Sequence, residues 1–359
     1  MEGGLRIGGA PPVTLRAQGL APDVPAFVEA TVLPGRGMML LQARLRLPSG
    51  EVVDALASPA PAEAAARLSG GAEDFAGNLS FAFGGAILAP FANRITGRPL
   101  SDSREIETEV AGKLVRLPRN WGGKAPGAAQ YAMHGLILQA GVAWSQGAPD
   151  RVTGELAAGD FEGHWTGEAH IAFEWRLEAG ALRLRVEVGN RGQGSLPMGV
   201  GWHPYFALPS GDRSQARLRL AAQQRATVDN YDEVLPTGQL EAVAGGPYEF
   251  DVADGRALGD QYLDDCFTGL RRGADGIIAE IRDPAANLGL RLTSPSPCVR
   301  AVQVYAPPGE AFVVVEPQTN LADPYGAQWG GQDTGMALIV PGDTMTYDVR
   351  VEPFDLRNP

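Results

Sequence analysis

The sequence predicts an all-β protein built as one large antiparallel β-sandwich. The chain of 359 residues contains 47 Gly and 28 Pro, and both residue types interrupt helices. They are spread along the whole chain, and the segments between them are short and often alternate between apolar and polar side chains. Such alternation is typical of half-buried strands, and many short strands separated by turns favour a sandwich. No repeat of 20–50 residues suggests a propeller or solenoid.

The clearest strands are expected at residues 170–177 and 181–188. In the second, Leu182, Leu184, Val186 and Val188 share one face and charged residues fill the other. A Gly-containing connection at 178–180 joins the two segments, as in a hairpin. One helix is expected at 60–68, where Pro61 precedes an Ala-rich stretch. Further strands are expected at 38–47, 216–220, 276–282, 288–293, 301–305, 311–316 and 345–351.

Composition and charge exclude several classes of protein. The formal net charge is −12, which is the opposite of the basic surface that nucleic-acid binding requires. Hydrophobic residues make up 44% of the chain, too many for a disordered protein. No apolar run reaches the roughly 18 residues that a membrane-spanning helix needs. Two distant cysteines, Cys266 and Cys298, form neither a disulfide scaffold nor a four-cysteine zinc site.

The chain shows no convincing linker between domains. We expect an N-terminal extension with a first strand at residues 1–24 and a single sandwich domain at residues 25–359. The first residues lack the basic start and apolar core of a secretory signal, and the last residues carry no anchor motif. We therefore expect a cytoplasmic protein with free thiols, although a secreted chain that has lost its signal would look the same. We expect a monomer or a homodimer.

Four segments carry polar residues that packing alone does not require. Asn93 and Arg94 follow a Gly-rich approach, and an amide beside a guanidinium suits hydroxyl-rich ligands. His134 precedes Gly135, and histidine is scarce in this chain of four histidines. For both segments, a structural role in a turn or loop stays open.

The other two segments carry an imidazole and a carboxyl group. His203 lies between Gly-Trp and Pro-Tyr-Phe, where Pro204 holds it extended and aromatic rings offer faces to sugar rings. Its ordinary pKa of about 6.5 suits proton transfer at neutral pH. Glu316 follows a continuous apolar run that predicts a strand buried on both faces, where a carboxylate is costly unless it is functional. A core histidine at a strand end, and a strand that ends with Glu316 in water, remain alternatives.

Other candidate sites are weaker. Asp264 and Asp265 are adjacent acids, expected in a loop. His164 and His170 share the parity of one strand, but their spacing is too long for a compact pair of metal ligands. No Walker A segment, dinucleotide fingerprint or Gly-x-Ser-x-Gly elbow is present. We therefore expect neither a metal nor a cofactor.

As an ordered set, these segments resemble the aldose 1-epimerase (galactose mutarotase) family. The resemblance runs from about residue 25 to residue 352 and is supported by the segments 232–238, 264–267 and 303–305. The matching pieces are Asn93-Arg94-Ile95, His134-Gly135, His203-Pro204-Tyr205-Phe206 and the strand-borne Glu316.

The resemblance implies a fold, an activity and a set of residue roles. The fold is the galactose mutarotase-like antiparallel sandwich, with the sugar bound in an open cleft on one sheet. The activity is the exchange of the α and β anomers of a free aldose, without a cofactor. In the implied site Glu316 is the catalytic base and His203 the catalytic acid. The implied substrate contacts are Asn93, Arg94, His134, Asp265 and Gln303.

The chain also departs from the well-known galactose-type enzymes. Ala89-Pro90-Phe91 stands where those enzymes have Gly-Arg before Ala-Asn-Arg, and Leu136 stands where a second Gly usually follows His-Gly. Pro317 replaces the Thr that usually follows the catalytic glutamate. The chain therefore resembles a divergent branch of the family, for which the motifs do not predict galactose as the preferred sugar.

Three other functions remain open from the sequence. A hexose-6-phosphate epimerase of the same superfamily would need cations near the site, such as Arg98 or Lys124, and the acidic chain does not favour it. A non-catalytic sugar-binding module would not need both His203 and Glu316. A glycosidase would use paired carboxylates, for which Asp265 and Glu316 are the candidates.

Overall fold

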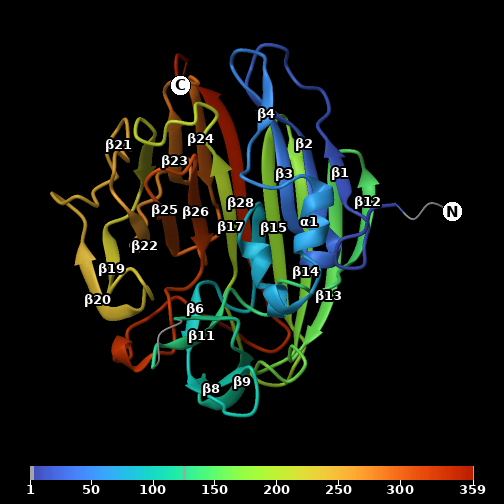
Figure 1. The fold of residues 1–359 in the computed structure, drawn as a ribbon, viewed down its shortest axis with the longest axis vertical. Coiled ribbons are helices and arrows are strands. Elements are labelled where there is room, and N and C mark those ends of the chain that lie inside the picture. Colours follow the sequence, from blue (N-terminus) through green and yellow to red (C-terminus); the bar gives the residue numbers. More distant parts are fainter. Residues whose placement is uncertain (1–3, 124–126, 359) are drawn as a thin grey trace.

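Two large antiparallel sheets face each other in the computed structural model, which describes residues 4–123 and 127–358 (Figure 1). The first sheet has 11 strands, with β4 beside β3. Its strands, in spatial order, are β1 (Val13–Arg16), β2 (Ala26–Leu33), β3 (Met39–Arg46) with β4 (Val52–Asp54), β5 (Gly85–Leu88), β17 (Gly201–Ala207), β26 (Phe312–Gln318), β25 (Ala301–Ala306), β22 (Leu263–Thr268), β19 (Gln224–Val228) and β20 (Pro236–Ala242).

The second sheet has nine strands and covers the inner face of the first. Its strands, in spatial order, are β12 (Ala143–Ala148), β13 (Arg151–Gly159), β14 (Ala169–Glu178), β15 (Ala181–Asn190), β28 (Thr344–Asp355), β24 (Leu288–Thr293), β23 (Ile277–Asp283), β18 (Arg217–Leu220) and β21 (Arg256–Ala257).

Smaller elements complete the described part of the chain. Two three-stranded sheets, one two-stranded sheet, one α-helix and three 3₁₀ segments are present. Their bounds are β6 (Arg94–Thr96), β10 (Trp121–Gly122) and β11 (Gln130–Met133); β7 (Arg98–Pro99), β8 (Glu105–Val110) and β9 (Lys113–Pro118); β16 (Leu196–Met198) and β27 (Ala337–Ile339); α1 (Pro61–Arg67); and the 3₁₀ segments Pro34–Arg36, Ala72–Phe81 and Ala327–Trp329.

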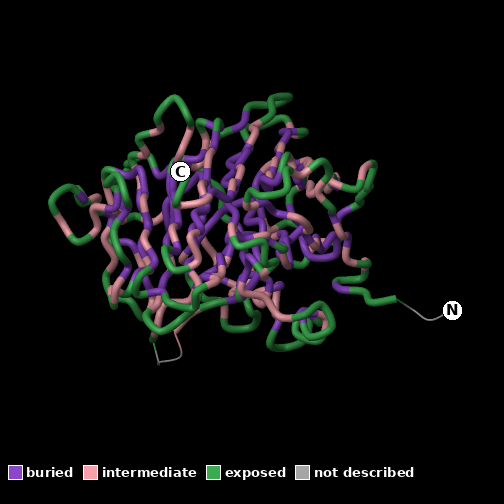
Figure 2. Tube along the Cα trace, turned by 90° about the horizontal axis from the view of Figure 1, so that it is seen from above, coloured by how far each residue is buried: buried purple, intermediate pink, exposed green. Residues whose placement is uncertain are grey.

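The main hydrophobic core lies between the two large sheets. Trp175 of β14 and Trp202 of β17 meet edge-to-face across it, with their ring centroids 5.5 Å apart. The indole N–H of Trp175 donates to the Met38 carbonyl at 2.8 Å, so this buried ring keeps its hydrogen bond. Buried backbone runs through the middle of both sheets, and exposed residues gather in the loops at their ends (Figure 2).

Strand alternation places polar side chains on the outer face of the first sheet. In β17, Trp202 belongs to the core between the sheets, so its neighbour His203 points to the outer face. In β26, Val315 belongs to the same core and Glu316 points outward. A second, smaller apolar cluster, which includes Phe81 and Tyr131, packs on this outer face. The outer face of the sheet thus forms the floor on which the site is built.

The structure confirms the all-β fold class and the elements expected with most support. Strands β14 and β15 form the expected hairpin, closed by Ala179 and Gly180, which both have positive φ angles of 47° and 87°. A two-residue turn of this kind matches the twist of antiparallel strands. Helix α1 spans Pro61–Arg67, within the predicted range 60–68. Every further strand that the sequence predicts overlaps an observed one, including β28 and β24.

Three local expectations are corrected. His203 lies in the interior of β17 rather than at a strand end, and β26 continues past Glu316 to Gln318. Glu316 therefore does not reach water, since only 1% of its surface is exposed. Asp264 and Asp265, expected in a loop, lie in β22. Pairing with the neighbouring strands decides each of these positions.

The termini and cysteines give few further constraints. Strand β1 is the edge of the first sheet and pairs with β2, with Val13 opposite Val32. Cys266 and Cys298 are free thiols, as expected. None of the helices in the described ranges is long and apolar enough to cross a membrane.

A buried ion pair fastens the segment Ala72–Phe81 to the first sheet. Both terminal nitrogens of Arg36 donate to the carboxylate of Asp74 at 2.9 Å, and the exposed fractions of these residues are 3% and 1%. Arg36 also donates to the Ser80 hydroxyl, and the backbone N–H of Leu79 donates to Asp74. Because this segment ends in Phe81, which lies over the site described below, the ion pair supports the site from behind.

We expect the Asp74→Ala variant to lose about 3 kcal/mol of unfolding free energy, because it leaves the Arg36 guanidinium buried without a counter-charge. Urea denaturation followed by fluorescence measures this loss. The matched control is Asp54→Ala, which breaks the half-exposed pair of Arg44 and Asp54 and should cost under about 0.5 kcal/mol. Equal losses in the two variants would contradict the supporting role of the buried pair.

Candidate active site

A cavity of about 400 Å³ lies on the outer face of the first sheet. Strands β17, β25 and β26 contribute its floor, and the segments around residues 78–94 and 121–134 contribute part of its walls. Six of the seven site residues predicted from the sequence line it, although they are far apart in the chain. These six are Asn93, Arg94, His134, His203, Gln303 and Glu316.

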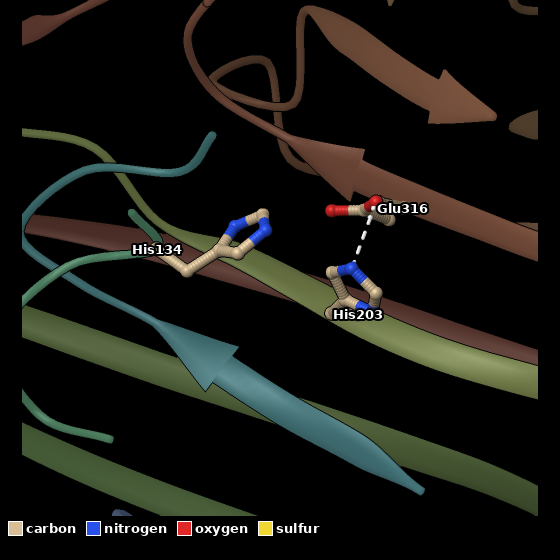
Figure 3. A group of neighbouring side chains, drawn as sticks. All are labelled: His134, His203 and Glu316. Atoms are coloured by element: carbon tan, nitrogen blue, oxygen red, sulfur yellow. Dashed lines mark ion pairs between the residues drawn. The ribbon is translucent and has the colours of Figure 1, made fainter. Parts of the chain in front are cut away.

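The contact between His203 and Glu316 lies at the floor of this cavity (Figure 3). The distance from His203 Nε2 to Glu316 Oε1 is 3.2 Å. The two residues come from the paired strands β17 and β26, and their exposed fractions are 5% and 1%. An imidazole nitrogen and a carboxyl oxygen therefore lie within ion-pair distance of each other in a nearly dry environment.

His134 stands beside this pair. Its ring meets the His203 ring edge-to-face, with the centroids 4.9 Å apart. His134 and Asn93 both have positive φ angles, of 63° and 61°, and the backbone N–H of His134 donates to the Asn93 carbonyl at 2.7 Å. A Cβ at Gly135 would lie 2.2 Å from the Ala89 carbonyl oxygen, so only glycine fits there. The two loops are thus locked together in a conformation that most residues avoid.

A chain of hydrogen bonds joins the remaining polar residues. Arg94 Nε donates to Asn93 Oδ1 at 2.9 Å, and Asn93 Nδ2 donates to Gln303 Oε1 at 3.0 Å. Gln303 Nε2 in turn donates to Asp264 Oδ1 at 2.6 Å. Arg94 also donates to the backbone carbonyl of Glu233. Each of these side chains is held by a hydrogen bond to the next, so the cavity wall presents hydrogen-bond donors and acceptors in fixed positions.

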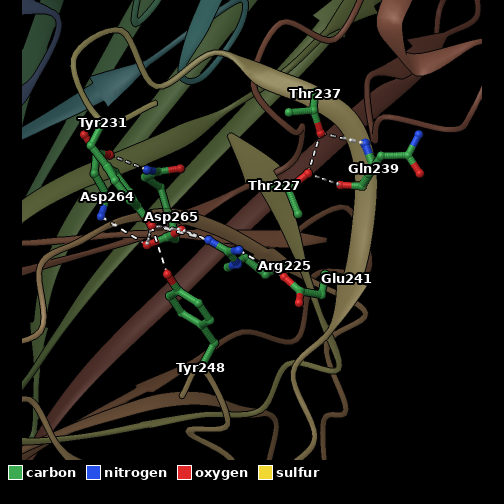
Figure 4. A network of polar contacts seen from close by, with 10 residues as sticks. Arg225, Thr227, Tyr231, Thr237, Gln239, Glu241, Tyr248, Asp264 and Asp265 are labelled. Carbon is green, nitrogen blue, oxygen red and sulfur yellow. Dashed lines mark hydrogen bonds and ion pairs between the residues drawn. The ribbon is translucent and has the colours of Figure 1, made fainter. Parts of the chain in front are cut away.

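Asp265 does not join this group, which corrects the sequence expectation. Adjacent residues of β22 point to opposite faces, and Asp264 is the one that lines the cavity. Asp265 lies on the face of Phe267, where Arg225 Nη1 donates to it at 2.5 Å (Figure 4). The Tyr231 hydroxyl also donates to Asp265, at 3.0 Å. Of these two neighbours, Asp264 is therefore the one that borders the cavity.

Burial shifts the protonation of the three ionisable groups toward their neutral forms. Burial raises the pKa of Glu316 well above 4.5, the negative charge of Asp264 raises it further, and the Arg94 guanidinium lowers it. Burial lowers the pKa of His203 to about 4. The pKa of His134 falls well below 6.5, mainly through burial and also through His203 and Arg94. His203 is therefore neutral at neutral pH, and burial favours the protonated form of Glu316 over its carboxylate.

One carboxyl oxygen at the cavity floor has no protein partner within the described ranges. Glu316 Oε2 has no hydrogen-bond partner among the described residues, although it is fully buried within the protein. Nearly every buried polar atom in a native protein has a partner, and unpaired ones call for an explanation. A hydroxyl group bound in the cavity would supply the missing donor.

A comparison with families of known proteins identifies the family of this chain. A model of the family described as aldose 1-epimerase matches residues 64–340, which is most of the chain. The chain belongs to the aldose 1-epimerase family. This match confirms the resemblance seen in the sequence motifs. The matched range contains all seven residues that the resemblance implied for the site.

Individual relatives of this aldose 1-epimerase family member are distant. It is 26% identical over 202 residues to the uncharacterized protein YphB of Escherichia coli, an alignment that spans 53% of this chain and 63% of that protein. A galactose mutarotase-like protein from Clostridium acetobutylicum is 18% identical, with a TM-score of 0.71 and coverage of 93% and 94% of the two chains. A galactose 1-epimerase from Lactobacillus acidophilus is 16% identical, with a TM-score of 0.63 and coverage of 96% and 99%. At such identities the solved structures establish the fold.

The two histidines and the glutamate also form a set that a metal ion could use. His134, His203 and Glu316 each offer a ligand atom, and these atoms lie within 4.8 Å of one another. Two imidazoles and one carboxylate are a donor set that divalent transition metals accept. Histidine ligands usually donate their second ring N–H to a protein group, but Nδ1 of both histidines has no partner in the described structure. The set is thus better suited to proton transfer than to holding a metal.

The other two histidines lie outside the cavity. The His164 ring contacts the Arg116 carbonyl at 2.7 Å, and the His170 ring lies 3.2 Å from the carboxylate of Glu155. Both side chains are about one third exposed, at 30% and 35%.

Several residues that line the cavity were missed from the sequence. The sequence alone does not show whether Asp264 or Asp265 faces the cavity, because that depends on the register of β22. Seven aromatic residues from separate segments also line the cavity: Phe81, Trp121, Tyr131, Tyr205, Tyr231, Tyr262 and Tyr305. Tyr205 and Tyr305 lie two residues from His203 and Gln303, a spacing that would have placed them on the same faces once these segments were known to be strands.

We expect the Glu316→Gln variant to be more stable than the wild type at pH 8 and about equally stable at pH 4. The folded-state pKa of Glu316 is raised, so between pH 4.5 and that raised value the folded chain binds more protons than the unfolded chain. Wild-type stability therefore falls as the pH rises through this window, whereas Gln does not ionise. A tenfold difference between the proton affinities of the folded and unfolded chains corresponds to about 1.4 kcal/mol of unfolding free energy.

Urea denaturation at the two pH values measures this difference. The control is Glu51→Gln at an exposed position, which should change the unfolding free energy by less than about 0.5 kcal/mol. A Glu316→Gln variant that is no more stable than the wild type at pH 8 would show that burial does not penalise the carboxylate.

Proposed function

We propose that this chain is a cofactor-independent aldose 1-epimerase, or mutarotase, which interconverts the α and β anomers of a free aldose. The observation that carries the proposal is the buried 3.2 Å contact between His203 Nε2 and Glu316 Oε1 within a cavity lined by hydrogen-bonding side chains. Placing two ionisable groups in so dry a position is costly unless they act together.

The reaction needs one base and one acid on the same sugar. A base removes the proton of the C1 hydroxyl while an acid protonates the ring oxygen, and the C1–O5 bond of the pyranose breaks to give the open aldehyde. Rotation about C1–C2 turns the other face of the carbonyl toward the ring hydroxyl. The ring then closes as the two groups return their protons in exchanged roles. No electrons leave the sugar, so no redox cofactor is required.

His203 and Glu316 supply this pair. We assign the base to Glu316 and the acid to His203, with one proton shared between them. Burial holds the free pair in its neutral form, with the proton on the carboxyl group. Transfer of that proton to His203 creates the carboxylate and imidazolium needed for ring opening, and the positive charge of Arg94 favours the carboxylate.

The remaining polar residues are proposed to hold the sugar. The hydrogen-bonded series of Asn93, Arg94 and Gln303 presents a wall of fixed donors and acceptors to hydroxyl groups. His134 lies next to His203 and can contact the ring oxygen or a neighbouring hydroxyl. Asp264 takes the place first given to Asp265. Groups fixed in this way orient the sugar without a further entropic cost.

We expect Glu316→Gln and His203→Asn each to lower kcat/KM for anomer exchange by about 10²–10⁴-fold while the fold is retained, because each removes one partner of the proton transfer. Polarimetry on freshly dissolved α-glucose and α-galactose, with NMR of the anomeric protons, measures the rates. The matched control is the pair Glu155→Gln and His170→Asn, since these residues also lie 3.2 Å apart but outside the cavity. Near wild-type rates in either active-site variant would overturn the assignment.

The alternative functions lack comparable support. A glycosidase based on Asp265 and Glu316 is disfavoured because Asp265 faces away from the cavity and pairs with Arg225. A sugar-binding module without catalysis would gain nothing from a buried acid–base pair. A hexose 6-phosphate would need cations, but Arg94 is the only Arg or Lys among the described residues lining the cavity. Arg98 is exposed and pairs with Glu107, and Lys124 lies outside the described residues.

We therefore expect kcat/KM for glucose to exceed that for glucose 6-phosphate by at least about tenfold, since Asp232, Glu233 and Asp264 also line the cavity and repel a phosphate. NMR of the anomeric protons compares the two sugars at equal concentration and ionic strength. Raising the salt concentration should narrow the difference by screening the carboxylates. A preference for the phosphorylated sugar would favour the hexose-6-phosphate epimerase instead.

A further inference from the structure

The chain that leaves the catalytic strand β26 returns to the back of the cavity wall. Strand β26 ends at Gln318, and residues 319–323, which follow it, are all buried. Two of them carry polar side chains, Asn320 and Asp323, whose exposed fractions are 0% and 3%. Neither residue lines the cavity. Because a buried polar side chain is nearly always hydrogen-bonded, its partners show which part of the structure it holds.

Asn320 holds the residue that precedes Asn93. Its Oδ1 accepts from the backbone N–H of Ala92 at 3.1 Å, and its Nδ2 donates to the Ala92 carbonyl at 2.9 Å. Nδ2 also donates to the Leu321 carbonyl at 2.9 Å. One amide group thus bonds both backbone groups of a single residue, as a neighbouring strand does in a sheet. Both the position and the direction of the backbone at Ala92 are therefore fixed.

Asp323 holds the residues that follow Asn93. Its backbone N–H donates to the Arg94 carbonyl at 2.7 Å. Its carboxylate accepts from the backbone N–H and from the hydroxyl of Thr96, both at 2.9 Å. Asp323 has a positive φ angle of 47°, which is uncommon for any residue other than glycine. Such a conformation persists where surrounding contacts enforce it, and it is often found beside functional sites.

The same segment is bonded to the start of the other catalytic strand. The backbone N–H of Thr319 donates to the Val200 carbonyl at 2.9 Å, and the N–H of Val200 donates to the Thr319 hydroxyl at 3.0 Å. Val200 immediately precedes β17, the strand that carries His203, and Thr319 lies three residues after Glu316. One short stretch of chain therefore joins the wall of the cavity to both strands that form its catalytic floor.

We propose that Asn320 and Asp323 are positioning residues for anomer exchange, which hold the backbone on either side of Asn93 and so set its side chain relative to the catalytic pair. This inference rests on the proposed mutarotase activity and concerns how the geometry of its site is maintained. Neither residue touches the sugar, since neither lines the cavity. Both act through the wall that Asn93 and Arg94 present.

The first test removes each of the two side chains. We expect Asn320→Ala and Asp323→Ala each to lower kcat/KM for anomer exchange at least about tenfold, because a misplacement of about 1 Å in a site can cost about 10²-fold. Asp323→Asn should stay within about threefold of the wild type, since its carboxamide can bond both groups of Thr96 and Asn tolerates positive φ. Polarimetry on freshly dissolved α-glucose and α-galactose measures the rates.

The matched control is Asn190→Ala, which removes another buried amide outside the cavity. The side chain of Asn190 donates to the Gly194 and Ile339 carbonyls at 2.8 Å and 2.7 Å, and its exposed fraction is 1%. This variant should lose stability but keep kcat/KM per folded molecule within about twofold of the wild type. Near-ultraviolet circular dichroism measures the folded fraction. If an Ala variant does not fold, Thr96→Val removes only the hydroxyl bond to Asp323 and should still lower kcat/KM about threefold.

A double-mutant cycle separates positioning from a general loss of stability. Asn93→Gly removes the side chain that is positioned, and glycine accepts the φ angle of 61° found there. In that background Asn320→Ala should lower kcat/KM by less than about twofold, because no Asn93 side chain remains to be placed. The positioning role is overturned if Asn320→Ala and Asp323→Ala both keep the wild-type kcat/KM, or if Asn320→Ala has the same effect in both backgrounds.

The failure of the proposed function would look different. If the wild type exchanges no aldose, the mutarotase assignment fails, and backbone hydrogen exchange then tests the positioning directly. The N–H of His134 donates to the Asn93 carbonyl at 2.7 Å and so reports on this wall. Asn320→Ala should accelerate its exchange about fivefold or more, whereas Asn190→Ala should not change it. An unchanged rate at His134 in Asn320→Ala would contradict the positioning role whether or not the protein is a mutarotase.

Discussion

The buried contact between His203 and Glu316 is the constraint on which the rest of the site depends. Each residue occupies the outer face of a central strand whose inner face carries a core residue, Trp202 behind His203 and Val315 behind Glu316. Moving either strand by one residue would turn the ionisable group into the hydrophobic core. The packing between the two sheets thus fixes the register, and the register fixes the 3.2 Å distance between imidazole and carboxyl group.

Burial shifts the pKa values of both groups in this pair, and it also makes their charged forms energetically unfavourable. Burial lowers the pKa of His203 and raises that of Glu316, so it favours the neutral form of both groups. The polar neighbours are assembled by loops in uncommon conformations, with Asn93 and His134 at positive φ and Gly135 against the Ala89 carbonyl. Such conformations persist only where the surrounding structure enforces them. Here the packed core of the sandwich holds these loops in their uncommon conformations.

The walls of the cavity come from separate segments with separate roles. The ion pair of Arg36 and Asp74 holds the segment that carries Phe81, and Arg225 with Asp265 holds Tyr231. Neither pair reaches the cavity floor, but each sets the position of a ring that lines it. Asp265 therefore supports the wall, whereas its neighbour Asp264 joins the hydrogen bonds of the site.

The sequence by itself predicted the strand-rich fold, the β14–β15 hairpin and six residues that line the cavity, because alternation and short motifs are local properties. These six residues are 93–94, 134, 203, 303 and 316. The tertiary structure decided between Asp264 and Asp265, since alternation separates neighbours onto opposite faces without showing which face borders the cavity. It also decided the burial that raises the pKa of Glu316, and the gathering of Trp121, Tyr231 and Tyr262 at one cavity. Both depend on burial and on contacts between segments far apart in the chain, which no local pattern encodes.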